Sequence, residues 1–410
     1  MTRTLFTGGL VYDGTLAEPV LGDLVVENGR IVDVGAGLDG DEAVDCAGGY
    51  VSPGFFDAHT HVTIDSPDQL EIAQRPFSLQ FYTAARNLKR TLDTGITTIR
   101  DAAGADLGIK EALVRGLIPG PRMQISISIL SQTGGHGDDW CVCGSTMPFF
   151  VPHPGRPANV VDGPDEVRKK VRELIRAGAD VIKVATTGGV LSPTDDPRHS
   201  QFRDAEIAVM VEEATAVGIS VMAHAQGTDG IKAAVRNGVR SIEHGIYLDD
   251  EAIEMMIEAG TWLVPTLHAP QAVLRGADAG MALPKAAVQK ARMVVEVHQD
   301  SVRRAHEAGV RIAMGTDCGV GAHGTNLDEL QLMEAAGLGA IDALHATTGS
   351  AAALLRVEDD RGTLAPGKRA DLVVVDGSPT DLVDLKHRVR GVYLDGELVS
   401  TGSAGETAEP

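Results

Sequence analysis

The sequence predicts an α/β protein in which a (β/α)8 TIM barrel is joined to a small β-sandwich built from both ends of the chain. Through the middle of the chain, short apolar runs alternate with amphipathic helical stretches, which is typical of repeated βα units and a parallel sheet. At both ends, apolar and polar residues alternate and are interrupted by Gly, Asn and Asp, which favours short strands joined by turns. The expected boundaries are 1–54 and 358–400 for the sandwich, 55–357 for the barrel, and 401–410 for a disordered tail.

The terminal strands come first along the chain. Alternating runs at 5–14, 22–35 and 42–51 predict strands, and runs of the same texture return at 369–377 and 389–402. Neither terminal set can bury a core by itself, so we expect the two sets to pair into one sandwich. The last residues, TGSAGETAEP, are small and polar, which predicts the disordered tail.

Eight candidate strands follow in the middle of the chain: residues 54–62, 95–103, 122–129, 179–187, 218–226, 238–246, 260–268 and 309–319. Helical patterns lie between them, for example at 165–179 and 204–218, and several of them end in Gly directly before the next strand. Eight such units predict a closed barrel, whose chemistry lies at the C-terminal ends of its strands. A doubly wound sheet is the alternative, but no Gly-rich phosphate loop follows the first strand.

Charge and cysteine content exclude several classes of protein. The formal charge is −21, and no basic run is present that could neutralise the phosphates of a nucleic acid. There is no secretory signal and no apolar stretch of the ~20 residues that a membrane span needs, so we expect a cytoplasmic protein. The four cysteines, Cys46, Cys141, Cys143 and Cys318, form neither a disulfide framework nor a paired CxxC zinc site. The expected partner is a small-molecule substrate, and the extensive helical surface favours a homo-oligomer.

Histidines stand where the first predicted strand ends. His59 and His61 are two residues apart, so in an extended strand both imidazoles point the same way, as two ligands of one metal ion must. Taken alone, this pair is a weak signal. Other strand ends strengthen it, because they bring His224, His244 and Asp317 to the same face of the barrel.

Lys183, in the fourth predicted strand, completes this set of polar groups from five strands. Core packing alone would require Val, Ile or Leu at these positions, since an unpaired buried charge costs several kcal/mol. An ammonium group beside two cations would be repelled, whereas a deprotonated lysine can add carbon dioxide and form a carbamate. That group is a carboxylate on a long arm and could bridge two ions. The alternative for Lys183 is an ordinary ion-paired lysine.

Five segments together resemble the amidohydrolase superfamily: GFFDAHTH, IKVATTGG, AHAQG, IEHG and GTDCG. The resemblance is greatest to its imidazolonepropionase-like and prolidase-like branch, which includes Xaa-Pro and Xaa-Arg dipeptidases. It covers nearly the whole chain, including GTLAPGKRADLVVVDG near the C-terminus, which resembles a returning strand of the sandwich. These motifs are specific for the metal site and far less specific for the substrate.

The resemblance implies two divalent ions and assigns a set of ligands to each. His59, His61 and Asp317 would hold the more buried ion, His224 and His244 the more exposed one, and carboxylated Lys183 would bridge both. Zinc fits the nitrogen-rich ligand set best, and manganese or cobalt would also fit. A hydroxide between the ions would attack a scissile carbonyl, while Asp317 takes its proton and passes it to the leaving nitrogen.

His136 lies in TGGHGD, which resembles a loop that faces the substrate in the dipeptidase-like members. It is a candidate for hydrogen bonding to the scissile carbonyl or to a substrate carboxylate; the alternative is a histidine that only braces its loop. Gln226 is a departure, since many dipeptidase-like relatives have Tyr there. An amide can donate a hydrogen bond but lacks the acidity and reach of a phenol, so Gln226 leaves room for a substrate other than a dipeptide.

Several residues near these motifs have two readings each. The segment after His136 could form an apolar wall for the substrate or, as we favour, a loop that packs over the barrel. Its apolar and cysteine side chains are Trp140, Cys141, Cys143, Phe149 and Phe150. His323 and Asn326 follow Asp317 and could line the pocket rim or cap the next helix. The acidic residues after Asn326 favour capping.

Three functions from different classes therefore remain. The first is hydrolysis of an amide-like C–N bond, in a dipeptide, an N-acyl amino acid, or a xenobiotic amide or carbamate. The second is hydrolysis of a lactone, phosphoester or cyclic urea at the same metal centre. The third is a non-catalytic scaffold, which would have lost ligands, whereas all six ligand positions are filled here. The first two need the same hydroxide and differ only in pocket shape.

Overall fold

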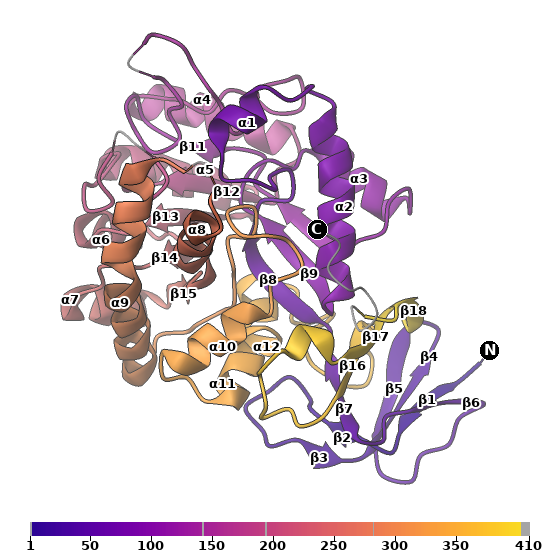
Figure 1. Cartoon of the computed structure of the whole chain (residues 1–410). Helices are drawn as coiled ribbons and strands as arrows, with labels where there is room; N and C mark the ends of the chain where they lie inside the picture. The colour runs from indigo at the N-terminus through magenta and orange to yellow at the C-terminus, as the bar shows by residue number, and fades with distance from the viewer. Residues whose placement is uncertain (1, 142, 193–194, 282, 403–410) are drawn as a thin grey trace.

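The computed structural model describes residues 2–141, 143–192, 195–281 and 283–402. Ten strands from the two ends of the chain form two sheets at one side of the molecule (Figure 1). One sheet has the order β5-β4-β1-β6 and the other β18-β17-β16-β7-β2-β3. The strands are β1 (Thr4–Thr7), β2 (Leu10–Val11), β3 (Val20–Leu21), β4 (Asp23–Glu27), β5 (Arg30–Gly35), β6 (Glu42–Asp45), β7 (Gly49–Pro53), β16 (Leu372–Asp376), β17 (Val389–Leu394) and β18 (Glu397–Ser400).

A shared apolar cluster joins these two sheets. Strand β16, from near the C-terminus, pairs antiparallel with β7, which lies more than 300 residues earlier. Phe6 from the first sheet packs edge-on against Tyr393 from the second, with ring centroids 5.0 Å apart. Leu24 and Leu372 belong to the same buried cluster. Of the tail predicted at 401–410, residues 403–410 lie outside the described residues.

The middle of the chain contributes two parallel sheets whose strands are almost fully buried. The first has the order β10-β9-β8 and the second β11-β12-β13-β14-β15. Their bounds are β8 (Phe55–Thr60), β9 (Ile96–Asp101), β10 (Arg122–Ile125), β11 (Ile129–Leu130), β12 (Val181–Ala185), β13 (Ser220–Ala225), β14 (Ser241–His244) and β15 (Trp262–Val264). Burial on both faces explains why these runs read as continuously apolar in the sequence.

Two segments lie between these sheets. The expected third strand, 122–129, is divided into β10 and β11, because Ile127 between them has a φ of +70°. The expected eighth strand, 309–319, has no strand assigned to it. It is nevertheless extended between β15 and β8: Ala313 N donates to Leu263 O at 3.0 Å, and Ala58 N donates to Met314 O at 2.9 Å.

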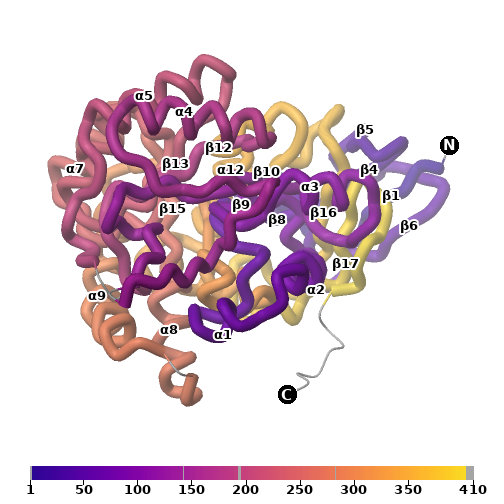
Figure 2. Tube along the Cα trace, turned by 90° about the horizontal axis from the view of Figure 1, so that it is seen from above, coloured from indigo at the N-terminus to yellow at the C-terminus, as the bar shows by residue number. Residues whose placement is uncertain are grey.

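Helices lie on the outer side of the parallel strands, as Figures 1 and 2 both show. On α4, Val167, Val171 and Leu174 form a buried stripe at helical spacing. Among the described residues, every helix is too short or too polar to cross a membrane. The helices are α1 (Gln69–Ala73), α2 (Leu79–Asp93), α3 (Leu107–Val114), α4 (Gly163–Arg176), α5 (Asp204–Ala216), α6 (Thr228–Arg236), α7 (Asp250–Ala259), α8 (His268–Asp278), α9 (Lys285–Ala308), α10 (Asp328–Ala335), α11 (Ala340–Ala346) and α12 (Gly349–Leu354), with a 3-10 turn at Leu385–His387.

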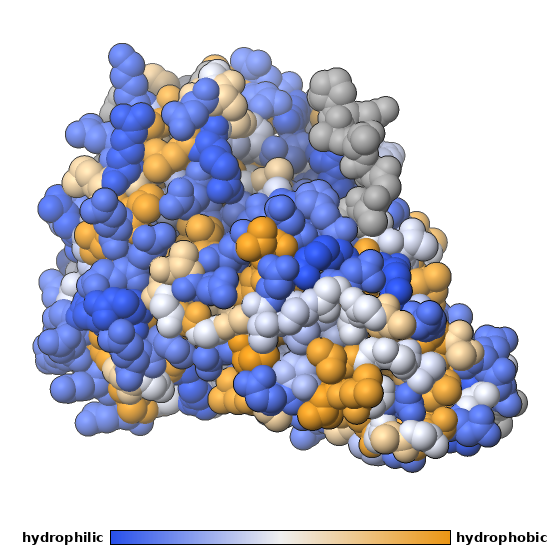
Figure 3. Space-filling view, turned by 60° about the horizontal axis from the view of Figure 1, so that its bottom comes forward, coloured by the Kyte–Doolittle hydropathy of each residue, from blue (hydrophilic) through white to orange (hydrophobic). Residues whose placement is uncertain are grey.

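The surface is largely hydrophilic on the face shown in Figure 3, with separate apolar groups between the polar side chains. Some of the most exposed large apolar side chains lie in or near the short strand β3, namely Leu16, Val20 and Leu21. β3 is an edge strand of its sheet, so one of its sides has no strand partner.

Candidate metal centre

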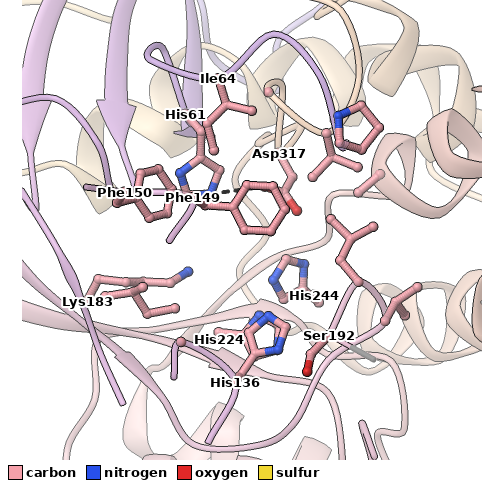
Figure 4. A pocket seen from close by; sticks show the side chains of 18 of the residues that line it. His61, Ile64, His136, Phe149, Phe150, Lys183, Ser192, His224, His244 and Asp317 are labelled. Atoms are coloured by element: carbon pink, nitrogen blue, oxygen red, sulfur yellow. Dashed lines mark ion pairs between the residues drawn. The ribbon is translucent and has the colours of Figure 1, made fainter. Parts of the chain in front are cut away.

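A cavity of about 360 Å³ opens where the parallel strands end (Figure 4). The strands β8, β12, β13 and β14 each place polar side chains in it, and the segment after β15 and α9 adds Asp317. The structure brings together the complete set of side chains that the sequence predicted for the site, all of them in the cavity lining: His59, His61, His136, Lys183, His224, Gln226, His244 and Asp317.

His59 and His61 face Asp317 through the same ring nitrogen. Their Nε2 atoms lie 3.6 and 3.2 Å from Asp317 Oδ1. Their Nδ1 atoms are engaged on the other side, His59 with Glu243 Oε2 at 2.7 Å and His61 with Ala103 O at 2.8 Å. Since a carbonyl or carboxylate oxygen can only accept, both Nδ1 atoms carry a proton, and Nε2 is the atom of each ring that faces Asp317. Although burial lowers the pKa of His61, the contact with Asp317 raises it above the usual value, so a metal ion bound there would replace a proton on Nε2.

His224 and His244 approach the same space from the neighbouring strands β13 and β14, with ring centroids 4.6 Å apart. His244 Nδ1 lies 2.6 Å from Thr266 Oγ1, so when Nδ1 donates to this hydroxyl, Nε2 is the atom left for a metal ion. His224 is oriented the other way, because its Nε2 donates to Gly188 O at 3.1 Å. The atom of His224 that remains for a metal is therefore Nδ1.

Ligand atoms of His59, His244 and Asp317 all lie within 4.8 Å of one another, close enough for divalent ions to be held among them. Burial lowers the pKa of His59, His224 and His244 well below the usual value, and repulsion from neighbouring imidazoles and the Lys183 amine adds to this effect. The neutral imidazole is the form that binds a metal ion.

Lys183 gives the strongest indication that the site holds more than protein. Its side chain is 1% exposed, and Nζ has no hydrogen-bond partner among the described residues. Burial lowers its pKa to about 8, although Glu243 and Asp317 partly offset the effect. An orphaned buried amine is costly, so this position favours a further group beside Nζ that the described residues do not supply. The donor set of imidazoles, a carboxylate and a lysine fits divalent ions.

Buried groups that the sequence reasoning missed support these ligands. Glu243 is fully buried beside His59, and its second oxygen accepts from Arg100 Nη2 at 3.0 Å and from Ser241 Oγ at 2.5 Å. Charged residues inside two strands that are buried on both faces, at Arg100 and Glu243, were the available signal. Asp57 accepts from Thr316 Oγ1 at 2.6 Å and so ties β8 to the segment that carries Asp317.

His136 and Gln226 lie on the side of the cavity near His224. The His136 ring stacks on the His224 ring, with centroids 4.2 Å apart and an angle of 17° between the planes. Gln226 is 5% exposed, and among the described residues nothing donates a hydrogen bond to its side-chain oxygen Oε1. Both side chains are therefore placed where a substrate could meet them.

The segment after His136 supplies a wall of the cavity. Trp140, Cys141, Phe149 and Phe150 line it, and the Phe150 ring lies 5.4 Å from the His61 ring. Cys143 is exposed. The segment is thus a loop over the strand ends and an apolar wall at the same time, so the two readings of the sequence are not exclusive.

His323 and Asn326, which follow Asp317 in the sequence, hold the site from outside the cavity. His323 is buried between Thr91 Oγ1 and His61 O, at 3.1 and 3.2 Å. The expectation that Asn326 caps the next helix is wrong: Leu327 holds that position, and the Asn326 side chain instead donates to Asp57 at 2.8 Å and accepts from Gly324 N. The demand of buried Asp57 for donors explains the difference.

Comparisons with known proteins show what the chain is similar to. A family model described as the amidohydrolase family matches residues 50–400. Ochratoxinase from Aspergillus niger is 35% identical over 376 residues, which are 87% of this chain and 77% of that protein. Imidazolonepropionase from Micrococcus luteus is 27% identical and covers 92% of this chain and 93% of its own. The crystal structure of a Xaa-Pro dipeptidase with bound methionine in the active site has a TM-score of 0.87, with 34% identity, 97% of this chain and 99% of that chain covered.

Proposed function

The chain belongs to the amidohydrolase family, and from that premise we propose that it is a binuclear metal-dependent enzyme that cleaves an amide-like C–N bond. A hydrolase acting on C–N bonds is what its similarity to ochratoxinase, imidazolonepropionase and a Xaa-Pro dipeptidase supports. One observation carries the binuclear part of the proposal: the imidazoles of His59, His61, His224 and His244, the carboxylate of Asp317 and the amine of Lys183, which has no hydrogen-bond partner in the described part of the chain, share one cavity.

In this proposal each ligand has a defined role. His59, His61 and Asp317 would hold the more buried ion, and His224 and His244 would hold the more exposed one. A carbamate on Lys183, derived from carbon dioxide, would bridge the two. Zinc suits so many imidazole ligands, and manganese or cobalt would also fit. Bound there, the ions would polarise the scissile carbonyl and supply a bridging hydroxide at neutral pH.

The residues of the chain handle the proton and the substrate. Asp317, whose carboxylate lies 3.6 and 3.2 Å from Nε2 of His59 and His61, would take the proton of the attacking hydroxide and return it to the leaving nitrogen. His136 contacts the substrate at the scissile group, and the side-chain amide of Gln226 forms a second polar contact. The buried pair of His59 and Glu243 keeps the ligand ring in place throughout.

We propose that the two parallel sheets form one (β/α)8 barrel over 55–357. The hydrogen bonds of the 309–319 segment to β15 and β8 support closure on one side, and the β10–β11 segment supports it on the other. The two terminal sheets form a β-sandwich over 1–54 and 358–400, supported by their shared core. A cytoplasmic location, a homo-oligomer and the absence of a nucleic-acid partner belong to the same proposal and rest on the sequence.

The substrate that we favour is an amide with an apolar or aromatic part. The cavity wall beside His61, across from His136 and His224, includes Phe149, Phe150 and Ile64, which suits such a group. Ochratoxinase and the Xaa-Pro dipeptidase suggest N-acyl amino acids and dipeptides as the first candidates. A cyclic amide or urea is the second candidate, because of the similarity to imidazolonepropionase.

A substrate screen tests this function. Protein loaded with zinc or manganese in the presence of bicarbonate is assayed with ochratoxin A and other N-acyl amino acids, Xaa-Pro dipeptides, carbamates, cyclic ureas, lactones and phosphotriesters. We expect hydrolysis of at least one N-acyl or N-carbamoyl compound, abolished in Asp317→Asn. Efficient turnover of lactones or phosphotriesters with every amide refused would overturn the proposal.

A further inference from the structure

A buried carboxylate that the proposed mechanism does not use lies directly behind His136. Asp195 is in the segment after β12, and its Oδ2 lies 3.1 Å from His136 Nδ1. The Asp195 side chain is 6% exposed. Although burial raises its pKa, the contact with His136 and the nearby charge of Lys290 lower it below the usual value. An ionised carboxylate only accepts, so Nδ1 of His136 carries a proton and Nε2 is the ring atom left to meet the substrate.

Gly189 and His224 both pack against the His136 ring. A Cβ atom at Gly189 would lie 2.1 Å from His136 Cε1, so the ring packs against a backbone that tolerates no side chain. His224 stacks on the ring, with 4.2 Å between the centroids. The backbone of His136 is held as well, because its N–H donates to Gln201 Oε1 at 2.9 Å. The ring therefore has little freedom except the choice of which nitrogen is protonated.

Lys290 ties this arrangement to the long helix α9. Its Nζ donates to the carbonyl oxygens of Gly189, Ser192 and Asp195 at 3.0, 2.7 and 2.5 Å. It also lies 3.6 Å from Asp195 Oδ1, which accepts from Gly189 N at 3.2 Å. Lys290 thus fixes both the backbone on which the His136 ring packs and the Asp195 carboxylate that contacts this ring.

We propose that Asp195 is a positioning residue that fixes the tautomer and orientation of His136, with Lys290 and Gly189 holding Asp195 and the ring in place. The inference rests on the proposed function insofar as His136 is taken to meet the substrate. In metal sites, a histidine that binds the metal through one ring nitrogen is often held by a carboxylate at the other ring nitrogen. Loss of that carboxylate lowers metal affinity or activity by about 10- to 100-fold. Here the held histidine would serve the substrate instead of a metal.

Kinetics of variants test the first half of the proposal. We expect Asp195→Asn to lower kcat/KM by about 10- to 100-fold on whichever amide is the best substrate. In a His136→Ala background the same change should have less than about a twofold effect, since two residues that act through one contact are not additive. Asp196→Asn is the matched control: Asp196 is adjacent in sequence but pairs with Arg198, and this variant should keep full activity. Additive effects of Asp195→Asn and His136→Ala would overturn the proposal.

Nitrogen NMR tests the tautomer without any activity. In protein labelled with 15N-histidine, His136→Ala identifies the His136 signals by their loss. We expect the wild-type ring to be protonated at Nδ1, and Asp195→Asn, but not Asp196→Asn, to change that pattern. A wild-type ring protonated only at Nε2 would refute the role of Asp195. If no amide is hydrolysed while the NMR result is as expected, the proposed function fails and the positioning role of Asp195 stands.

Discussion

Lys183 is the residue on which the metal chemistry depends most. Its amine is buried without a hydrogen-bond partner among the described residues, and burial lowers its pKa to about 8. Nearby dications would lower the pKa further, and the free amine is the form that captures carbon dioxide. The carbamate would then carry negative charge to the ions, and the ions would protect it from breakdown. Metal loading should therefore depend on bicarbonate.

Lys183→Ala should lower the activity by roughly 100-fold or more and reduce the amount of bound metal, while the chain still folds. Loss of an outer-shell partner alone costs 10- to 100-fold, and a bridging group contributes more than such a partner. Activity assays with elemental analysis and circular dichroism check this outcome, and acetate or propionate should restore part of the activity. Lys89→Ala, at a surface pair with Asp93, is the control. Unchanged metal content in an active Lys183→Ala protein would contradict the bridging role.

Glu243→Gln should weaken metal binding by roughly 10- to 100-fold, because Glu243 holds His59 through Nδ1 and neutralises the buried Arg100. The neutral amide of Gln would bind His59 Nδ1 more weakly than a carboxylate does, and it would not neutralise the charge of Arg100. Competition with a chelator measures the affinity. Glu111→Gln, at an exposed pair with Arg115, should leave the affinity unchanged. Equal affinities of wild-type and Glu243→Gln protein would mean that the His59 contact is only structural.

The positions of the proposed ligands could be predicted from the sequence, whereas most of the contacts that hold them could not. His59 and His61 are two apart in the first predicted strand, and His224, His244 and Asp317 lie at the ends of other predicted strands, so the predicted barrel brings them to one face. The supports depend on side-chain contacts between distant segments. Asp195, for example, reaches His136 from 59 positions away, and no local pattern announces that contact.

At the scale of elements, two of the eight strands expected in the middle of the chain differ from the prediction, and in each a residue of positive φ changes the backbone direction. The expected third strand stops at Ile127, with a φ of +70°, and the expected eighth contains Asp317, with a φ of +61°. Positive φ is uncommon for such side chains, and tertiary contacts impose it. At Asp317 the turn places the carboxylate beside His59 and His61, so the irregularity that hid the strand is part of the site.

Gly189→Ala should lower kcat/KM clearly while it changes the melting temperature little. The new Cβ would displace the His136 ring, since the two would otherwise lie 2.1 Å apart, yet the β12 strand ends earlier and is untouched. Steady-state kinetics beside thermal denaturation distinguish the two effects. Gly35→Ala is the control, because no atom lies within 4 Å of a Cβ built there. A large fall in melting temperature with unchanged kinetics would show that Gly189 serves only the fold.

At the scale of the whole molecule, an ion-pair cluster joins the parallel strands to the terminal sheets. Arg122, at the start of β10, donates to both oxygens of Asp371 at 2.8 and 3.1 Å and to Asp395 at 2.7 Å. The Asp371 side chain is 2% exposed, so solvent cannot replace the lost donor. The two terminal sheets could be predicted from their alternating pattern, but this junction could not, because its partners are some 250 positions apart.

Arg122→Ala should therefore lower the free energy of unfolding by about 1–3 kcal/mol, the cost of leaving a buried partner unsatisfied. Chemical denaturation measures the change. Arg115→Ala removes an exposed pair with Glu111 and should cost less than about 0.5 kcal/mol. Equal effects of the two substitutions would mean that the junction contributes no more than a surface ion pair. Neither substitution should alter metal content, since neither residue lines the cavity.

Metal stoichiometry tests the central claim most directly. Elemental analysis of protein purified without chelator, and of the same protein after loading with zinc or manganese in bicarbonate, counts the ions that each chain binds. The ligand set of His59, His61, His224, His244 and Asp317, with a carbamate on Lys183, predicts about two divalent ions per chain in the active enzyme. A fully active enzyme with one ion per chain, unchanged by added metal and bicarbonate, would contradict the binuclear centre and the bridging hydroxide that depends on it.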